Sequence, residues 1–280
     1  MEQVIINVLS SCEVDATCGT KATSLAVLKK LGVSVPDFYA IPSSCFEEFC
    51  QKYGVMLPEI FYESDKFDVQ AIEKFEYAKM LNVEELLRRF AQGRYMVRSS
   101  SIPSKDVDLN QFPSMISGAF ESFFASNVSE IEENILKVWK SIYSEKAYNQ
   151  CRIFSRYPII KGVGVLIQKY IDPVISGVVH TENGAATVNW IRGHLSKIVS
   201  GEELGNSINV YLSPKNQYIL RGIESDVLLV KNNNFESVFK SILDTSNVIQ
   251  QNFGCEQEIE WIFDGEAVWV VQSQALISQK

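Results

Sequence analysis

The chain has 280 residues, of which 46% are hydrophobic and 21% are charged, and it carries a formal net charge of -8 at pH 7. This length and composition indicate a globular protein built as one large domain or as two smaller lobes. The acidic balance argues against a general nucleic-acid binder, which would show a basic stripe, whereas a nucleotide site needs only a few local cations.

The first half of the chain carries mostly helical patterns. Apolar residues recur at helical spacing from Lys21 to Leu31, and Gly32 provides a stop signal, which predicts a helix over 21–31. Residues 1–17 show no clear pattern. In chain order, the sequence then predicts an extended stretch over 33–42, a helix over 44–52, one or two helices over 69–92, a strand over 95–99 and a polar loop over 101–117. Ser129 and Glu132 form a capping box, which predicts the start of a long helix that runs to about Cys151.

From Gly162 the apolar pattern changes from helical spacing to alternation. Helices first and strands later favour an α+β fold. We divide the chain into an N-terminal lobe, residues 1–163, and a C-terminal lobe, residues 164–280, and we expect a ligand in the cleft between them. The elements predicted for the second lobe are strands over 164–171, 176–181, 185–191, 208–212 and 218–223, a helix over 235–251, and a closing hairpin over 256–274.

The cysteines and the N-terminus bear on the compartment. Six cysteines and two histidines include no Cys-x-x-Cys pair and no spacing typical of zinc ligands. The N-terminus lacks the basic start and apolar core of a secretory signal, and no apolar stretch approaches the roughly 18 residues of a membrane span. We therefore expect a cytoplasmic protein with free thiols that binds neither membranes nor nucleic acid.

Two short segments suit phosphate oxygens, although the sequence has neither a P-loop nor a Rossmann fingerprint. Segment 19–21, Gly-Thr-Lys, places Lys21 in the first turn of a predicted helix, where free amides and the helix dipole attract anions. Segment 97–100, Val-Arg-Ser-Ser, places Arg98 on a predicted strand, and its planar fork matches phosphate geometry. The alternatives are a surface lysine and a structural salt bridge.

The closing hairpin is the most informative feature of the sequence. Asp264 and Gly265 form a turn signal between two alternating runs. If the turn pairs Asp264 with Val268, then Glu260 lies opposite Gln272. Two carboxylates on one strand and two amides on the other would thus place hard oxygen atoms side by side, which suits Mg²⁺; the alternative is an ordinary solvated sheet face. These four residues are Glu258, Glu260, Gln272 and Gln274.

Four segments, 19–21, 97–100, 176–181 and 256–274, occur in this order. Together they resemble the nucleotide-binding domain of phosphoenolpyruvate synthase and pyruvate phosphate dikinase, which has an ATP-grasp fold; rifampin phosphotransferase carries a similar domain. The resemblance runs from about Thr17 to Leu276. It implies an ATP-grasp-like α+β fold, ATP and Mg²⁺ as cofactors, and a reaction that moves the β-phosphate of ATP to a histidine and leaves AMP.

The resemblance also implies roles for individual residues. It assigns ATP phosphate binding and catalysis to Lys21 and Arg98, and Mg²⁺ binding to Glu260 and Gln272 with Glu258 beside them. A loop that covers the phosphates would contain Gly118 and Ser122. Adenine would pack against the strand segment of Gln168, Lys169 and Tyr170.

The sequence departs from the family pattern at several places. Gln274 stands where the family usually has a phosphate-binding arginine, and Ser196 stands where it has an acid. His180 replaces a usual phenylalanine, so it is a candidate phosphoryl acceptor as well as a packed strand residue. The chain closes after the hairpin, without the phosphohistidine and substrate domains of full-length relatives, so we expect a nucleotide module on its own.

Three functions follow as expectations. The first is an ATP-dependent, AMP-forming phosphotransferase that acts on a small molecule or on a separate phosphohistidine-domain protein. The second is an ATP-grasp ligase that activates a carboxylate as an acyl-phosphate and releases ADP. The third is a nucleotide-binding or scaffold subunit without catalysis, which the changes at Gln274 and Ser196 would permit.

Overall fold

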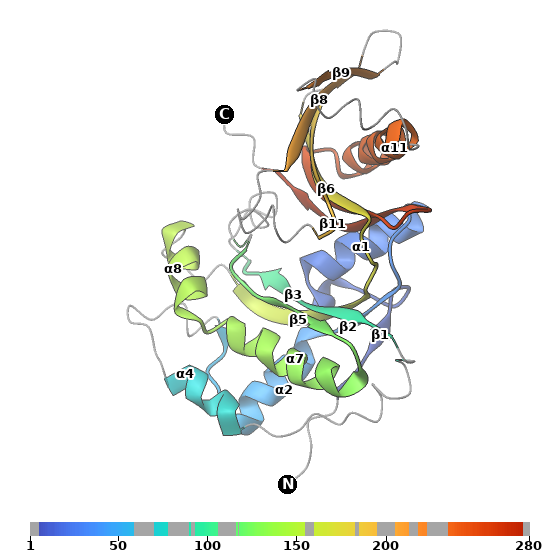
Figure 1. The fold of residues 1–280 in the computed structure, drawn as a ribbon. Coiled ribbons are helices and arrows are strands. Elements are labelled where there is room, and N and C mark those ends of the chain that lie inside the picture. Colours follow the sequence, from blue (N-terminus) through green and yellow to red (C-terminus); the bar gives the residue numbers. More distant parts are fainter. Residues whose placement is uncertain are drawn as a thin grey trace. The chain divides into compact units, whose positions relative to one another are not determined.

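The structure, a computed structural model, divides the chain into two compact units (Figure 1). The first comprises Met1–Ala26 and Asp37–Tyr170, and the second comprises Val27–Pro36 and Ile171–Lys280. The sequence predicts a division after residue 163, but strand β5 (Ile160–Lys169) continues across that position, so the first unit extends to Tyr170. The structure describes residues 6–58, 70–77, 90, 93–105, 116, 118–154, 160–182, 185–194, 205–212, 218–222 and 235–276.

The first unit is built on a five-stranded antiparallel sheet in the order β1-β2-β5-β3-β4. Besides β5, its strands are β1 (Leu9–Ser10), β2 (Phe38–Ile41), β3 (Tyr95–Pro103) and β4 (Ser122–Ala125). Its helical elements are η1 (Ala16–Cys18), the start of α1 (Thr20–Lys30), α2 (Ser43–Tyr53), α4 (Gln70–Glu73), η2 (Lys74–Tyr77), α7 (Val128–Ser141) and α8 (Glu145–Phe154).

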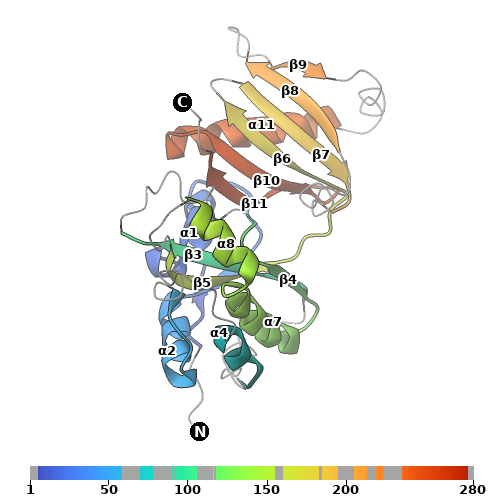
Figure 2. The same ribbon diagram turned by 90° about the vertical axis from the view of Figure 1, so that its left-hand side faces the viewer.

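The two faces of this sheet have different neighbours. Val97 and Ile167 are fully buried on one face, in a core that also contains Trp139 of α7. Because side chains alternate along a strand, Ser100 points to the opposite face. There its Oγ accepts a hydrogen bond from the backbone N–H of Ala22, in the first turn of α1, at 3.1 Å. Helices α2 and α7 therefore cover one face, and the start of α1 lies on the other (Figure 2).

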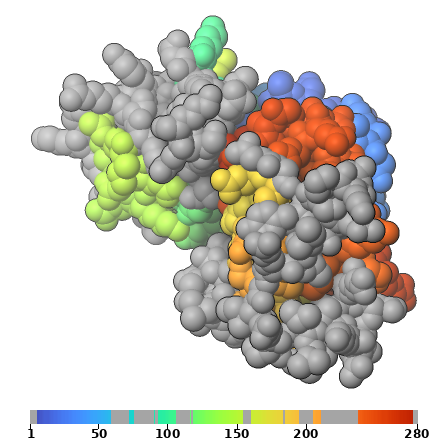
Figure 3. Space-filling view, turned by 90° about the horizontal axis from the view of Figure 1, so that it is seen from above, coloured from blue at the N-terminus to red at the C-terminus, as the bar shows by residue number. Residues whose placement is uncertain are grey.

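The second unit is built on a six-stranded antiparallel sheet in the order β11-β10-β6-β7-β8-β9, with α11 (Phe235–Phe253) packed on one face (Figure 2). Phe239 of α11 contacts Trp190 and Trp261, with ring centroids 6.0 and 6.3 Å apart. The opposite side of α11 is exposed (orange-red in Figure 3). The strands are β6 (Ile175–Glu182), β7 (Ala185–Arg192), β8 (Asn206–Leu212), β9 (Tyr218–Gly222), β10 (Gln257–Phe263) and β11 (Val268–Ala275).

Gly177 of β6 allows the core of the second unit to close. It is paired with Trp261 on one side and with Trp190 on the other. A Cβ atom at this position would lie 2.3 Å from the carbonyl oxygen of Asn189 and 2.8 Å from the Trp261 ring. The missing side chain therefore lets the indole of Trp261 lie across the strand beneath α11.

Most predicted elements are confirmed, including the α+β class, the helices over 21–31, 44–52 and 235–251, and the closing hairpin. The strand predicted over 95–99 was too short, because β3 stays paired with β5 as far as Pro103. The first residues of the loop predicted over 101–117 are therefore strand, and residues 106–115 and 117 lie outside the described part of the chain. Of the helices predicted over 69–92, α4 and η2 are described.

The long helix predicted from Ser129 to Cys151 was wrong in two respects. Its N-cap is Asn127, whose side chain accepts a hydrogen bond from the Glu130 N–H at 3.0 Å, and the Glu130 carboxylate accepts one from the Ser126 N–H at 2.7 Å. The helix is thus capped two residues earlier than predicted, at Asn127 instead of Ser129. The chain also leaves the helix after Ser141, so α7 and α8 are separate.

Candidate functional site

In the first unit, the start of α1 packs closely against the sheet. Gly19, directly before α1, has φ 85° and ψ 171°, a conformation that is essentially confined to glycine. A Cβ atom there would lie 2.0 Å from the carbonyl oxygen of Ser100. The Thr20 hydroxyl donates to the carbonyl of Ser101 at 3.3 Å. Lys21, the second residue of α1, is therefore carried on a helix start that is anchored to β3.

Arg98 lies on the same face of the sheet as this helix start. It precedes Ser100 by two residues on β3, so the two side chains point to the same side. Arg98 is paired with Ser122 of β4 and with Leu166 of β5. Paired residues share a face, so the structure brings Arg98, Ser122 and the Lys21-bearing end of α1 together on one face of the first unit.

The predicted adenine segment belongs to the first unit and not to the C-terminal lobe, because β5 pairs with β2 and β3. The Gln168 side chain is almost completely buried. Lys169 and Tyr170 are fixed by backbone hydrogen bonds to Asp37 and Arg94, at 2.7 and 2.8 Å. The Tyr170 ring contacts Phe124, with centroids 5.0 Å apart. Gly118 lies in a turn before β4 with φ 69°.

In the second unit, the predicted pairing of Glu260 with Gln272 is confirmed, but the turn differs from the prediction. Phe263, and not Asp264, pairs with Val268, so four residues form the loop. The register then shifts by one between Trp261 and Glu260, which leaves Val271 as an extra residue in β11. With a regular ladder from this turn, Glu260 would face Val271, and Gln272 would point to the opposite face. The bulge therefore brings Gln272 to Glu260.

The loop is held in place by the Asp264 side chain. Its Oδ1 accepts hydrogen bonds from the N–H groups of Glu266 and Ala267, both at 2.8 Å, and its Oδ2 accepts one from Trp269 Nε1 at 2.8 Å. Partial burial by itself raises the pKa of Asp264, but these hydrogen bonds outweigh it and lower the pKa. The turn signal in the sequence thus acts through the carboxylate of Asp264.

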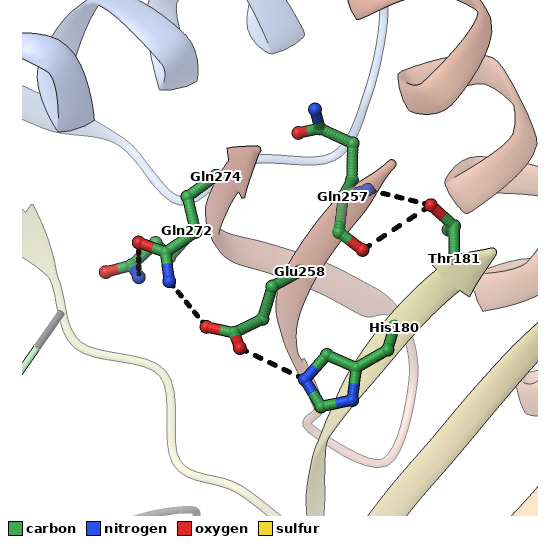
Figure 4. Close-up of polar contacts among 6 residues, drawn as sticks. All are labelled: His180, Thr181, Gln257, Glu258, Gln272 and Gln274. Carbon is green, nitrogen blue, oxygen red and sulfur yellow. Dashed lines mark hydrogen bonds and ion pairs between the residues drawn. The ribbon is translucent and has the colours of Figure 1, made fainter. Parts of the chain in front are cut away.

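Polar residues gather on the sheet face that α11 does not cover (Figure 4). Glu258 is paired with His180 on β6 and with Gln274 on β11. One carboxylate oxygen of Glu258 lies 3.0 Å from His180 Nε2, and the other accepts a hydrogen bond from Gln274 Nε2 at 2.6 Å. Gln274, which stands in place of the expected arginine, donates to an acid here. Reasoning from the sequence did not connect His180 with Glu258, because strand pairing between β6 and β10 spans 78 residues.

The hydrogen bond from His180 is the main cause of a lowered pKa of Glu258; burial opposes this shift, and electrostatic attraction to His180 and the hydrogen bond from Gln274 assist it. Since the pKa is lower in the folded state, the stability gained from this contact is present above the ordinary pKa of glutamate. It is lost as the pH falls through the lowered value. We predict that His180→Phe raises the pKa of Glu258 and that His180→Gln, which keeps a donor, raises it less. Carboxyl NMR titration of Glu258 checks both; equal pKa values in the wild type and His180→Phe would contradict the assignment.

The donor set of the hairpin fits Mg²⁺. Glu260 and Gln272 offer one carboxylate and one amide oxygen on adjacent strands. Mg²⁺ commonly takes few protein ligands and completes its shell with water and phosphate oxygens. Within the described ranges, no cluster of three or more His, Cys, Asp and Glu side chains forms a self-sufficient metal site. Ser196 lies outside the described residues.

Residues 15–279 match the family described as "Pyruvate phosphate dikinase, AMP/ATP-binding domain". The chain belongs to this family. Membership confirms the resemblance stated on sequence grounds and carries with it the predicted ATP-grasp-like fold class. The chain is therefore a nucleotide-binding domain of the kind found in ATP-utilising enzymes.

Individual relatives are more distant. The chain is 22% identical to a "Probable phosphoenolpyruvate synthase" from Archaeoglobus fulgidus over 317 aligned residues, which cover 92% of this chain and 39% of that protein. The chain thus spans about two fifths of the length of this curated relative. Among solved structures, D-alanyl-alanine synthetase A from Vibrio cholerae matches with 10% identity and a TM-score of 0.38, over 92% of this chain and 55% of that one. An L-amino acid ligase from Bacillus licheniformis matches with 11% identity and a TM-score of 0.39, over 94% of this chain and 44% of that one. These TM-scores are too low to support more than the sequence match does.

All six cysteines are free thiols in the structure, as predicted. Burial raises the pKa of Cys50 to about 12, which makes this thiol unreactive. Among the helices described, none has the length and apolar character that a membrane crossing requires.

Proposed function

We propose that the chain binds Mg-ATP and transfers a phosphoryl group in an AMP-forming reaction. The acceptor is a small molecule or a separate protein with a phosphohistidine domain. The observation that carries this proposal is the bulged hairpin, which sets the Glu260 carboxylate opposite the Gln272 amide on one sheet face. This pairing supports Mg²⁺ binding between phosphates, and the family description supports ATP.

In the first unit, Lys21 and Arg98 are the proposed phosphate-binding groups, with Gly118 and Ser122 as the phosphate-covering segment. Phosphoryl transfer gains most of its acceleration from cations that stabilise the charge of the transferring group. Arg98 suits this role because its guanidinium offers a bidentate fork. Gln168, Lys169 and Tyr170 are the proposed adenine contacts. Glu260 and Gln272 would hold Mg²⁺, with Glu258 beside them, and the bound ion would supply positive charge to neutralise the phosphate oxygens.

The proposal predicts that Glu260→Ala abolishes measurable Mg-ATP binding, because a single carboxylate supplies the only charge among the two proposed metal ligands. Calorimetry with Mg-ATP and with ATP in excess EDTA measures this. Glu266→Ala removes an exposed carboxylate from the same hairpin and should bind as the wild type does. Chromatography of the products then distinguishes AMP from ADP. Equal binding by wild type and Glu260→Ala would refute the metal assignment.

A second candidate is a ligase that activates a carboxylate and releases ADP. Gln274 favours it, since the amide donates to Glu258 where a phosphate-binding arginine is expected. ADP formation that depends on an added carboxylate would select this reading. Tight nucleotide binding without any turnover would select a non-catalytic subunit instead.

A further inference from the structure

A histidine with no assigned role stands on the polar face of the six-stranded sheet. His180 of β6 lies opposite Glu258 of β10, and its Nε2 is 3.0 Å from Glu258 Oε2 (Figure 4). The imidazole is 38% exposed. In the described part of the chain, no hydrogen bond reaches its Nδ1.

Glu258 is itself held in a fixed orientation. Gln274 Nε2 donates to Oε1 at 2.6 Å, and Gln272 Nε2 lies 3.4 Å from Gln274 Oε1. Because a carboxylate only accepts hydrogen bonds, His180 donates through Nε2–H, and a neutral ring then carries its lone pair on Nδ1. A carboxylate that fixes the tautomer and orientation of an imidazole is the arrangement found in general bases.

This pair stands next to the proposed metal ligands. Glu258 and Glu260 are two residues apart on β10, so they share a face with Cα atoms about 7 Å apart. Gln272 and Gln274 are related in the same way on β11. A small acceptor that contacts His180 would therefore lie beside Glu260 and Gln272, the residues that would hold Mg²⁺.

We propose that His180 is the general base for the acceptor, that Glu258 and Gln274 are its positioning residues, and that the acceptor reacts through a hydroxyl or amine group. This proposal rests on the Mg-ATP site proposed above. His180 Nδ1 takes the proton of the O–H or N–H group as that oxygen or nitrogen bonds to phosphorus. The attacked atom is the β-phosphorus of ATP: its bridging bond to the α-phosphate oxygen breaks, and the electron pair leaves on AMP. The γ-phosphate stays attached to the transferred β-phosphoryl group and is then released to water as inorganic phosphate. A carboxylate acceptor is already deprotonated near neutral pH and needs no base.

The test compares the wild type with His180→Gln, which keeps a donor to Glu258 but cannot act as a base, and with His180→Ala, which leaves space for added imidazole. The probes are water, glycerol and ethanolamine as acceptors, and acetate with hydroxylamine to trap an acyl-phosphate. Thr187→Ala is the matched control, because Thr187 is paired with His180 but bonds to Asn209. Calorimetry with Mg-ATP runs on every variant.

We expect His180→Gln to bind Mg-ATP like the wild type and to lose about 10²-fold or more in turnover with hydroxyl or amine probes. Added imidazole should restore part of the activity of His180→Ala, and Thr187→Ala should be unaffected. The base role would be overturned by unchanged turnover in His180→Gln or by the absence of imidazole rescue. It would also be overturned if a wild type that binds Mg-ATP turned over no hydroxyl or amine probe. Trapped acyl-phosphate or acid-labile phosphate on His180 would likewise overturn it. Absence of Mg-ATP binding by the wild type would instead overturn the proposed function, and the base role with it.

Discussion

Replacement of Arg98 by alanine should lower the rate of phosphoryl transfer by about 10²- to 10³-fold, with a smaller effect on Mg-ATP binding. Arg98 lies on the sheet face that receives the start of α1, opposite Ser122, and its guanidinium is the proposed partner of the transferring phosphoryl group. A contact that strengthens as charge develops lowers kcat more than it raises KM. Steady-state kinetics with the best acceptor found for the wild type measures both constants.

Two variants make this result specific. Arg98→Lys keeps the charge but loses the planar fork, so it should recover only part of the rate. Arg192→Ala removes an exposed arginine at the end of β7 and should leave both constants unchanged. If Arg98→Ala had the same kcat as the wild type, Arg98 would not be a catalytic residue.

Replacement of Gly19 by alanine should destabilise the protein by about 3 kcal/mol or more. The residue has φ 85° and ψ 171°, and a methyl group would meet the Ser100 carbonyl oxygen at 2.0 Å, so either the start of α1 or strand β3 must move. The same displacement would separate Lys21 from the face that carries Arg98. Urea unfolding measures the free-energy change, and calorimetry measures the accompanying loss of Mg-ATP binding.

Gly32, just beyond the other end of α1, is the matched control. It also has a positive φ, 81°, but a Cβ atom there meets nothing within 4 Å. Gly32→Ala should therefore cost only the backbone strain, about 1–2 kcal/mol, and should leave binding intact. Equal destabilisation by the two substitutions would show that the contact with Ser100 contributes nothing.

Local patterns were reliable where they depend on neighbouring residues. Helical spacing identified α1, α2 and α11, and alternation identified the strands that surround His180 and Glu260. Ranges failed where a distant partner decided them. Strand β3 runs to Pro103 because β5 pairs with it. Helix α7 differs for a local reason: it begins at Val128 because Asn127, with Glu130, caps the helix two residues before the predicted cap.

The family motifs gave the candidate residues but not their surroundings. The expected pairing of Glu260 with Gln272 is present although the expected turn is not, because two differences offset each other: a longer loop and a bulge at Val271. Alternation alone cannot reveal a bulge, since the extra residue obeys no sequence period.

The sequence by itself determined the family, the α+β class, the order of the elements and the identity of the phosphate- and metal-binding candidates, because these depend on short-range periodicity and on local motifs. Only the tertiary structure decided that the start of α1 lies on the Arg98 face and that His180, Glu258 and Gln274 form one hydrogen-bonded group. These contacts join residues far apart in the chain. Sheet register and side-chain geometry, which no local pattern encodes, set their distances.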